Sequence, residues 1–309
     1  MIFGIVFAVI ALISVIVLIG GYISYRLAFR ASDERLLDPY LDIDHDPEYE
    51  DVRRELISFL VSRPCEEIRI KSRDGLTLFA RYYHVKDGAP LEIQVHGYRS
   101  ISRRDFSASG RESISEEYNL LLIDQRAHGE SDGQVISFGI KERFDVIDWV
   151  KYAENRFGKD TKIILLGISM GAATVLMAAG EDLPDSVKGV IADCPYSSPI
   201  DIICRVGKRM HIPAFVTRII APIGARVYGG FSLYESSPVS AVSRAKVPIL
   251  LIHGEADNFV PLYMSREIAA KNPEIRLLTF PLARHGFSFL VDTDRYRIAV
   301  REFIAEAIS

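Results

Sequence analysis

The sequence predicts one doubly wound α/β domain with a mostly parallel, eight-stranded sheet and an inserted helical cap, preceded by an N-terminal transmembrane helix. Short apolar runs alternate with helical patterns from residue 67 onward. Several of these runs, such as Ile163–Leu166, are apolar at every position, as expected for strands that are covered by helices on both faces. Residues 2–25 carry no charged side chain, and 19 of these 24 residues are apolar.

The apolar run at residues 2–25 (the predicted domain 1–25) is long enough to cross a membrane, since about 20 residues in a helix suffice. A cleaved signal peptide is the competing interpretation, but no Lys or Arg precedes the run and no Ala-x-Ala follows it. We expect a retained single-pass anchor in the cell membrane. Arg26, Arg30 and Arg35 follow the run, so the positive-inside rule favours a cytoplasmic catalytic domain. The bias is only three residues, and the extracytoplasmic side stays open.

Residues 26–65 are predicted to form an acidic juxtamembrane linker that ends in a short amphipathic helix near residues 49–60. Residues 31–51 carry nine acidic side chains and one Arg, while the whole chain has a net charge of only −4. The run at residues 42–46 resembles the start of a calcium loop, but Pro47 and Arg53 occupy the positions where such a loop needs Gly and Glu. The sequence has no basic stripe for nucleic acid.

The catalytic domain is predicted over residues 66–309, and Asp74-Gly75 is a hairpin turn between its first two strands. Between Tyr196 and Val247 the alternation of strands and helices stops, so we expect a cap at about residues 197–246 that shapes the substrate pocket. The three cysteines have no metal-type spacing, so no metal site is predicted. The expected strands are Ile68–Lys71, Thr77–Val85, Leu91–His96, Leu120–Gln125, Lys162–Ile168, Gly189–Ala192, Pro248–His253 and Ile275–Pro281, and the expected helices are Lys141–Arg156, Ala172–Ala179, Leu262–Lys271 and Arg295–Ala307.

The pattern Gly-x-Ser-x-Gly occurs twice, around Ser131 and around Ser169. A nucleophile elbow needs a strand, a sharp turn and a helix whose first turn faces the serine. Ser169 follows an apolar strand and precedes the helical run Ala172–Ala179, whereas Ser131 lies in a polar loop between two acidic residues. Ser169 is therefore the candidate nucleophile, and Ser131 is interpreted as a loop residue.

A serine hydroxyl is a weak nucleophile until a base takes its proton. Among the seven histidines, His285 follows the last predicted strand, at the sheet edge where an elbow serine would lie. In the chain order serine, acid, histidine, the acid follows the next-to-last strand, which selects Asp257. Asp193 is the second choice for this acid, and Glu255 is the third.

The oxyanion that forms during acyl transfer needs fixed N–H donors. The backbone of Met170, directly after the nucleophile, is predicted to supply one donor. The second is expected in the loop after the third strand, from Tyr98 with Arg99 as fallback. His96 and His128 are expected to be structural, and the Arg99 side chain to meet an acidic acyl group or, as we favour, to form a surface salt bridge.

Together these motifs resemble the α/β-hydrolase superfamily, and within it the bacterial membrane-anchored serine aminopeptidase-like and acyl-hydrolase (esterase) members. The resemblance covers about residues 66–309 and implies a serine hydrolase that needs no cofactor. The matching residues are His96-Gly97, Asp124-x-Arg126-x-His128-Gly129-x-Ser131, Gly167-x-Ser169-x-Gly171, Asp193-Cys-Pro-Tyr-Ser-Ser, His253-Gly254-x-x-Asp257 and His285-Gly286.

We expect cleavage of carboxylic esters, including lipid esters or thioesters, through a Ser169–His285–Asp257 triad and an acyl-enzyme intermediate. The expected partners are a small-molecule acyl ester and the membrane. A serine aminopeptidase or amidase is the alternative enzyme. A membrane-tethered binding protein that kept the fold without the chemistry is the alternative of another class.

Overall fold

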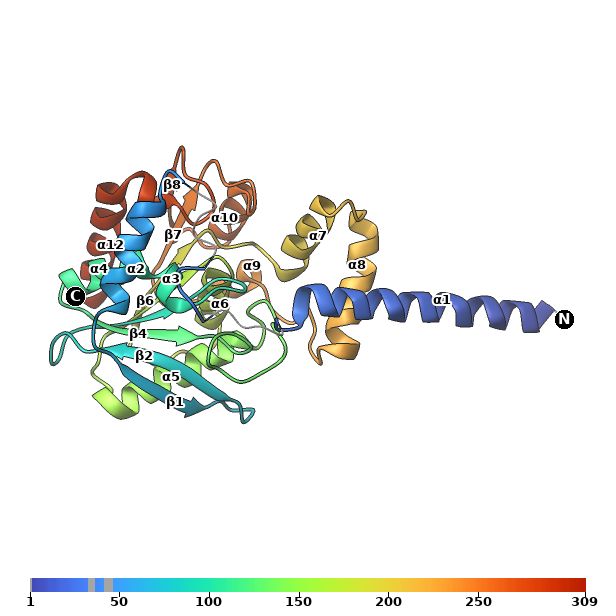
Figure 1. Cartoon of the computed structure of the whole chain (residues 1–309), viewed down its shortest axis with the longest axis horizontal. Coiled ribbons are helices and arrows are strands. Elements are labelled where there is room, and N and C mark those ends of the chain that lie inside the picture. The colour runs from blue at the N-terminus through green and yellow to red at the C-terminus, as the bar shows by residue number, and fades with distance from the viewer. Residues whose placement is uncertain (1, 33–36, 42–46) are drawn as a thin grey trace.

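The computed structural model of the chain describes residues 2–32, 37–41 and 47–309. The calcium-like run at residues 42–46 lies outside the described residues. Figure 1 shows a rounded α/β body from which the helix α1 (Ile2–Ser24) projects to one side.

The sheet has eight strands in the order β1-β2-β4-β3-β5-β6-β7-β8. β2 runs antiparallel to both of its neighbours, and every other neighbouring pair is parallel. This confirms the predicted doubly wound, mostly parallel sheet, and all eight predicted strands form with small differences at their ends. Their bounds are β1 Glu66–Lys71, β2 Thr77–Tyr83, β3 Leu91–Val95, β4 Asn119–Asp124, β5 Ile163–Ile168, β6 Val187–Asp193, β7 Ile249–Gly254 and β8 Arg276–Phe280.

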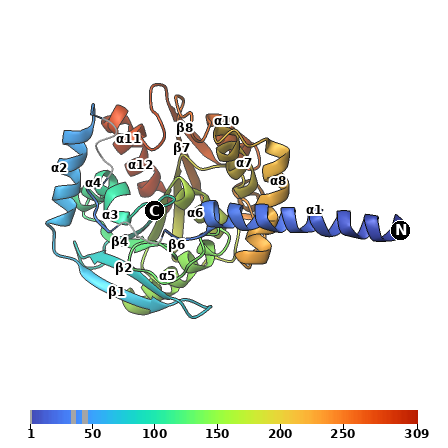
Figure 2. The same ribbon diagram turned by 45° about the vertical axis from the view of Figure 1, so that its right-hand side comes forward.

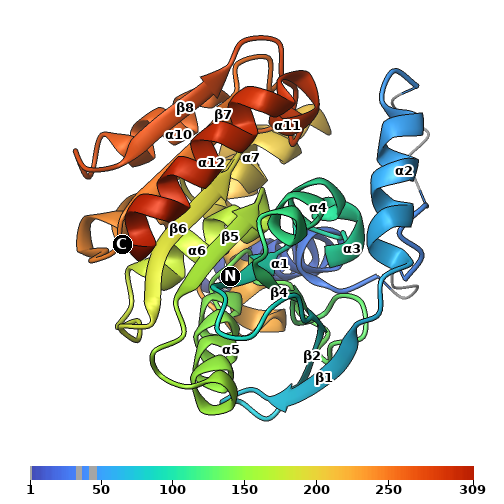
Figure 3. The same ribbon diagram turned by 90° about the vertical axis from the view of Figure 1, so that its left-hand side faces the viewer.

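Helices cover both faces of this sheet (Figure 3). One face packs against α5 (Glu142–Phe157), α6 (Met170–Ala179) and α10 (Leu262–Ala269), with Trp149 and Leu176 in the core. The other face packs against α4 (Ser107–Ser115) and α12 (Thr293–Ile308). The central strands are buried on both sides, which explains why β5 carries no polar side chain and why β4 is apolar between its two end residues.

The helices predicted from apolar periodicity form as α5, α6, α10 and α12. Two helices between β3 and β4, α3 (Ser102–Asp105) and α4, were not predicted. Their sequence is rich in serine and charge, and α4 buries mainly Ser107, Gly110 and Ser113. Small polar residues leave no apolar periodicity to recognise. The helix α11 (Ser288–Val291) was not predicted either, because its four residues are too few to show a helical period.

The segment between β6 and β7 is helical, as expected of the predicted cap. It contains α7 (Pro199–Arg209), α8 (Ala214–Ile223), the π-helix η2 (Gly224–Tyr228), α9 (Pro238–Ala241) and the 3-10 helix η3 (Val242–Arg244). The end of α1 packs against α8 and η2, which Figures 1 and 2 show from two directions. A Cβ atom on Gly21 would lie 2.9 Å from Ile223, so glycine permits this close approach of the two helices.

α1 and the π-helix η1 (Tyr25–Phe29) that continues it form one apolar stretch, long enough by length and composition to cross a membrane. The chain enters the globular body directly after α1. Phe29 is fully buried against the rings of Phe138 and Phe231, at centroid distances of 5.8 and 5.4 Å. Phe29 O accepts a hydrogen bond of 2.7 Å from Ile136 N. The predicted linker (26–65) therefore begins with residues that belong to the core, and it ends in the helix α2 (Glu50–Val61) near the predicted position.

The burial of Phe29 predicts that the segment after α1 stabilises the catalytic body. Phe29→Ala should lower the free energy of unfolding by about 3–5 kcal/mol, because a buried aromatic side chain is lost and a cavity remains. The measurement is urea unfolding of the full chain in a non-ionic detergent. Phe3→Ala is the matched control, since Phe3 lies on α1 with 92% of its surface exposed. Equal unfolding free energies for both variants would contradict this role of Phe29.

Glu92 on β3 predicts a pH dependence of stability. Burial raises the pKa of Glu92 to about 7, although its carboxylate accepts hydrogen bonds from Gln94 and Ser113. A raised pKa stabilises the fold fully below the unfolded-state pKa near 4.5, and this contribution is lost as the pH rises through about 7. The loss between pH 4 and pH 8 is on the order of 3 kcal/mol.

Glu92→Gln should therefore flatten the decline of the unfolding free energy between pH 5 and pH 8, measured by urea unfolding in detergent. Glu267→Gln on the exposed side of α10 is the control and should keep the decline of the unsubstituted chain. A Glu92→Gln variant with an unchanged decline would show that Glu92 does not carry this pH dependence.

Candidate active site

Ser169 lies in the sharp turn between β5 and α6, as the predicted elbow requires. Its backbone is in the left-handed region, with φ of 55°, which is strained for a residue other than glycine. Ser169 N donates a hydrogen bond of 2.8 Å to Asp193 O on the neighbouring strand β6, which helps to hold the turn. The turn presents the Ser169 hydroxyl at the carboxyl edge of the sheet.

The two glycines of the Gly-x-Ser-x-Gly motif are needed because backbones cross closely at this turn. A Cβ atom on Gly167 would lie 2.3 Å from Gly171 O. A Cβ atom on Gly171 would lie 1.7 Å from Val95 O at the end of β3. No side chain fits in either place, so α6 can begin directly against β3 and β5 only with glycine at both positions.

The structure brings together the three predicted residues Ser169, His285 and Asp257. Ser169 Oγ and His285 Nε2 are 2.9 Å apart, so the hydroxyl can donate its proton to the imidazole. His285 Nδ1 and Asp257 Oδ2 are 2.6 Å apart, as when the Nδ1 proton is donated to the carboxylate. The imidazole then has Nε2 free to accept a proton from the serine.

Asp257 is held as a carboxylate by several donors. The backbone N–H groups of Phe259 and Val260 both donate to Asp257 Oδ1 at 2.8 Å. Burial alone would raise the pKa of Asp257, but hydrogen bonding to His253 and His285 outweighs burial and holds the pKa well below its ordinary value. The loop after β7 is therefore built around an ionised acid that faces His285.

His253 is a supporting residue that the sequence analysis did not single out. Its ring is fully buried, with Nε2 2.8 Å from Val260 O and Nδ1 2.7 Å from Ser265 Oγ. Nε2 also lies 3.5 Å from Asp257 Oδ2. These contacts bind the Asp257 loop to α10. In the sequence, the pattern His253-Gly254-x-x-Asp257 was the signal that could have identified His253 as a supporting residue.

The two other acids considered for the triad take different places. Asp193 ends β6 beneath the elbow, where burial raises its pKa to about 6. Glu255 Oε1 instead accepts a hydrogen bond from Thr279 Oγ1 at 2.7 Å, on the exposed side of the sheet end. Asp257 is the carboxylate that contacts the Nδ1 atom of His285.

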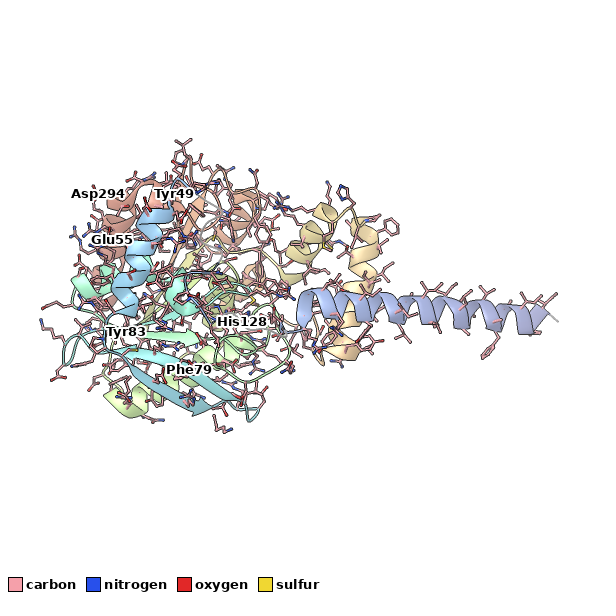
Figure 4. All side chains as sticks on the ribbon, in the orientation of Figure 1. Tyr49, Glu55, Phe79, Tyr83, His128 and Asp294 are labelled. Carbon is pink, nitrogen blue, oxygen red and sulfur yellow. The ribbon has the colours of Figure 1, made fainter. Side chains whose placement is uncertain are left out.

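The loop after β3 lies next to the elbow, as the oxyanion hole requires. A Cβ atom on Gly97 would lie 3.5 Å from Ser169 Cβ, so this loop and the nucleophile nearly touch. Gly97 N donates to Asp105 Oδ2 at 2.8 Å, and Arg99 N donates to His128 Nε2 at 3.0 Å. The fallback donor Arg99 is thus engaged by His128 (labelled in Figure 4), which favours the N–H of Tyr98 between them.

The side chains of Tyr98 and Arg99 bind the segment that follows α1. The Tyr98 hydroxyl donates to Ala28 O at 2.9 Å. Arg99 Nη2 donates to Leu27 O at 3.0 Å and to Arg30 O at 3.2 Å. The two roles considered for the Arg99 side chain, an acyl-group contact and a surface salt bridge, are therefore replaced by a third. It ties the loop after β3 to the N-terminal segment.

Beside Ser169 lies a pocket with a volume of about 300 Å³. Its walls come from the loop after β3, from α2 and α3, and from the segment around α11. No described residue between 197 and 246 lines it, so the expectation that the cap shapes this pocket is wrong for the described part of the chain. The main lining side chains are Arg53, Leu56, Tyr98, Arg104, Phe106, Ile168, Phe259, Phe287, Phe289 and Leu290.

The contribution of α2 to the pocket was not predicted. Leu56 and Arg53 face it from a segment that was interpreted as part of a linker. The ring of Tyr49, labelled in Figure 4, lies 5.5 Å from the ring of Phe287 and fixes the start of α2 over the site. The signal in the sequence was the apolar spacing of Leu56, Ile57 and Leu60, which are buried against the body.

The other Gly-x-Ser-x-Gly serine has a structural role. Ser131 Oγ donates to Asp124 O at 2.5 Å and accepts from Phe79 N at 2.8 Å. Both partners belong to neighbouring strands, and the Ser131 side chain is fully buried. Ser131 therefore joins its loop to the sheet, as the interpretation of a loop residue expected.

Among the described residues, one group of metal-type side chains lies close together: Cys194, Asp257 and His285. Two of the three are already joined to each other in the arrangement around Ser169. Burial raises the pKa of the Cys194 thiol well above its ordinary value, so this group stays protonated and is a poor metal ligand. The cluster fits proton transfer better than metal binding.

The fold and the comparison with known families agree on the class of protein. A model of the α/β-hydrolase fold matches residues 104–207, which include the elbow and the strands around it. The eight-stranded sheet has the matching architecture, so the chain has the α/β-hydrolase fold.

Three proteins are similar to this chain in structure or in sequence. The esterase Pf2001 of Pyrococcus furiosus superposes with a TM-score of 0.67 at 22% identity, covering 83% of this chain and 94% of that one. YqkD of Bacillus subtilis is 29% identical over 189 residues, which is 60% of this chain and 62% of YqkD. YfhR of Escherichia coli K12 is 27% identical over 203 residues, which is 62% of both chains. YqkD and YfhR are described as uncharacterised proteins, and the matches span about three fifths of their length.

Proposed function

We propose that this protein is a serine hydrolase that cleaves carboxylic esters, with Ser169, His285 and Asp257 as its catalytic residues. The observation that carries the proposal is the continuous contact from Asp257 Oδ2 to His285 Nδ1 and from His285 Nε2 to Ser169 Oγ, at 2.6 and 2.9 Å. The strained elbow at Ser169 adds to this, because it holds the hydroxyl at the pocket.

The proposed reaction proceeds through an acyl-enzyme. Ser169 Oγ attacks the ester carbonyl while His285 Nε2 takes the hydroxyl proton and then gives it to the leaving alcohol. Asp257 holds the imidazole tautomer and stabilises the imidazolium that forms. The backbone N–H groups of Met170 and Tyr98 would hold the oxyanion. A water molecule, activated by His285, then releases the acid and restores the Ser169 hydroxyl.

The charges around the pocket favour an ester over an aminoacyl peptide. Arg53 and Arg104 both line the pocket, and a guanidinium repels the free amine that an aminopeptidase must bind. Asp105 in the same wall is engaged by Gly97 N and Ser100 Oγ. The esterase among the structural neighbours supports the same choice as an analogy of fold.

We further propose that α1 is a retained anchor in the cell membrane and that the catalytic domain lies on the cytoplasmic side. The burial of Phe29 supports retention, because cleavage after α1 would separate a core residue from its helix. Arg26 and Arg30, next to the end of α1, support the cytoplasmic orientation. The proposed partners are an acyl ester and the bilayer.

Ser169→Ala should abolish ester cleavage, lowering kcat by about 10³-fold or more, because the acyl-enzyme can no longer form. Labelling of the full chain by a fluorophosphonate probe should disappear with it. Ser131→Ala is the matched control, since it changes the serine of the second Gly-x-Ser-x-Gly motif and should retain labelling. Thermal unfolding checks that both variants are folded. Labelling that persists in Ser169→Ala would assign the nucleophile to another residue.

A series of p-nitrophenyl esters from acetate to palmitate, run beside aminoacyl anilides, tests the substrate class. The pocket of about 300 Å³ is at the small end of ligand sites, so kcat/KM should be highest for short and medium acyl chains and lower for palmitate. Anilides should react at least roughly ten-fold more slowly than the best ester, because the guanidinium groups of Arg53 and Arg104 at the pocket repel a free amine. Faster cleavage of the anilides would favour the aminopeptidase alternative.

A further inference from the structure

The cap carries an apolar face that the catalytic site does not use. Phe215 and Ile219 on α8 and Val227 on η2 are 69%, 52% and 57% exposed. Phe215 and Ile219 are four residues apart and therefore lie on one side of α8. Thr217 and Ala221 are buried, and their spacing places them on the opposite side of the helix. The exposed apolar side of α8 thus points away from the body of the protein.

This face lies where α1 leaves the body. α8 crosses α1 near the C-terminal end of α1, while the rest of α1 extends away from the body (Figures 1 and 2). A Cβ atom on Gly20 would lie 3.1 Å from Ile220, and Tyr228 donates its hydroxyl proton to Leu18 O at 3.1 Å. These contacts hold α8 at the level of residues 18–21 of α1, and the exposed apolar side of α8 lies at the same level.

The free part of α1 has the length of a bilayer core. The helix from residue 2 to residue 19 spans roughly 27 Å, against about 30 Å for the hydrocarbon layer. When α1 spans the membrane, α8 therefore lies at the boundary between the acyl chains and the headgroups. An amphipathic helix at that level buries its apolar side in the lipid.

The charge of the cap fits an anionic lipid surface. Residues 199–230 contain five basic side chains and one acidic side chain, Asp201. Lys208 and Arg209 are exposed at the end of α7, and Arg226 is exposed on η2, which also carries Val227 of the apolar face. Basic side chains next to an exposed apolar stripe are the pattern of interfacial helices on anionic bilayers. The basic side chains are Arg205, Lys208, Arg209, Arg218 and Arg226.

We propose that the face formed by Phe215, Ile219 and Val227 (the α8 face) docks into the surface of an anionic bilayer beside α1. The proposal rests on the proposed membrane anchoring and extends it from one helix to a second contact. Two contacts, a spanning helix and an interfacial helix across it, prevent rotation of the domain about the axis of α1. A second copy of the chain is the less favoured occupant, because the α8 face adjoins the lipid that already surrounds α1.

Tryptophan fluorescence in vesicles tests the α8 face. The chain has one tryptophan, Trp149, which is fully buried, so an introduced tryptophan can be followed above this background. Phe215→Trp and Ile219→Trp report from the α8 face. Leu282→Trp is the matched control, since Leu282 is an 81% exposed apolar residue of the catalytic body. Each full-chain variant is reconstituted into vesicles of brominated phosphatidylcholine, with and without phosphatidylglycerol.

We expect bromolipids to quench the added emission of Phe215→Trp and Ile219→Trp by roughly two-fold or more, because interfacial helices sit ~5–10 Å into the headgroup and acyl boundary. Quenching should be stronger with phosphatidylglycerol, and Leu282→Trp should stay unquenched. Unquenched emission at both α8 positions would overturn the proposal. Blue-shifted emission without quenching would also overturn it, since a protein surface would then cover the face.

Carbonate extraction of the same vesicles separates this result from the anchor. Release of the chain by carbonate would contradict the membrane anchoring itself. Retention of the chain together with unquenched tryptophans at residues 215 and 219 would contradict only the docking of the α8 face. The ester hydrolysis of each variant, measured in detergent, checks that the catalytic body is intact.

Discussion

The close approach of α6 to the strands beneath it determines the geometry of the whole site. With no side chain at Gly171, the first turn of α6 rests on the carbonyl of Val95, at the end of β3. The turn between β5 and α6 must therefore be sharp, and the backbone of Ser169 lies in the left-handed region within it. The same contact places Ser169 beside Gly97 in the loop that continues β3. One backbone contact therefore sets Ser169 and the nearest N–H groups relative to each other, independently of the side chains of His285 and Asp257.

The parts of the structure that could be predicted from sequence are those whose signal is local. The buried strands are mainly apolar, so their runs mark them directly. Ser169 differs from Ser131 by the strand before it and the helix after it, and chain order singles out Asp257 and His285. The parts that could not be predicted depend on contacts between distant segments. Arg53 reaches the pocket from a helix that precedes the first strand and lies outside the predicted catalytic domain, and α4 is assembled from small polar residues that only the tertiary fold can bury.

Polar groups around the site act mainly by holding backbone. His128 accepts a hydrogen bond from Arg99 N, and His253 is close to both Val260 O and the carboxylate of Asp257. The imidazole of His128 joins the loops after β3 and β4, and the imidazole of His253 joins the loop after β7 to α10. Because buried polar groups are costly when they lack partners, such a network resists displacement of either loop. The positions of Ser169, His285 and Asp257 thus depend on His128 and His253, two histidines that are not among the residues lining the pocket.

The hydrogen bonds from Tyr98 and Arg99 to the carbonyls of residues 27, 28 and 30 give the molecule a mechanical property. A load along α1 reaches α8 and η2 at residues 18–21 and then this segment, where Phe29 packs between aromatic rings. The hydrogen bonds from Tyr98 and Arg99 pass it from this segment to the loop beside Ser169. The segment after α1, which would carry tension from the membrane, and the loop after β3, which would stabilise charge in the reaction, are therefore joined directly by hydrogen bonds.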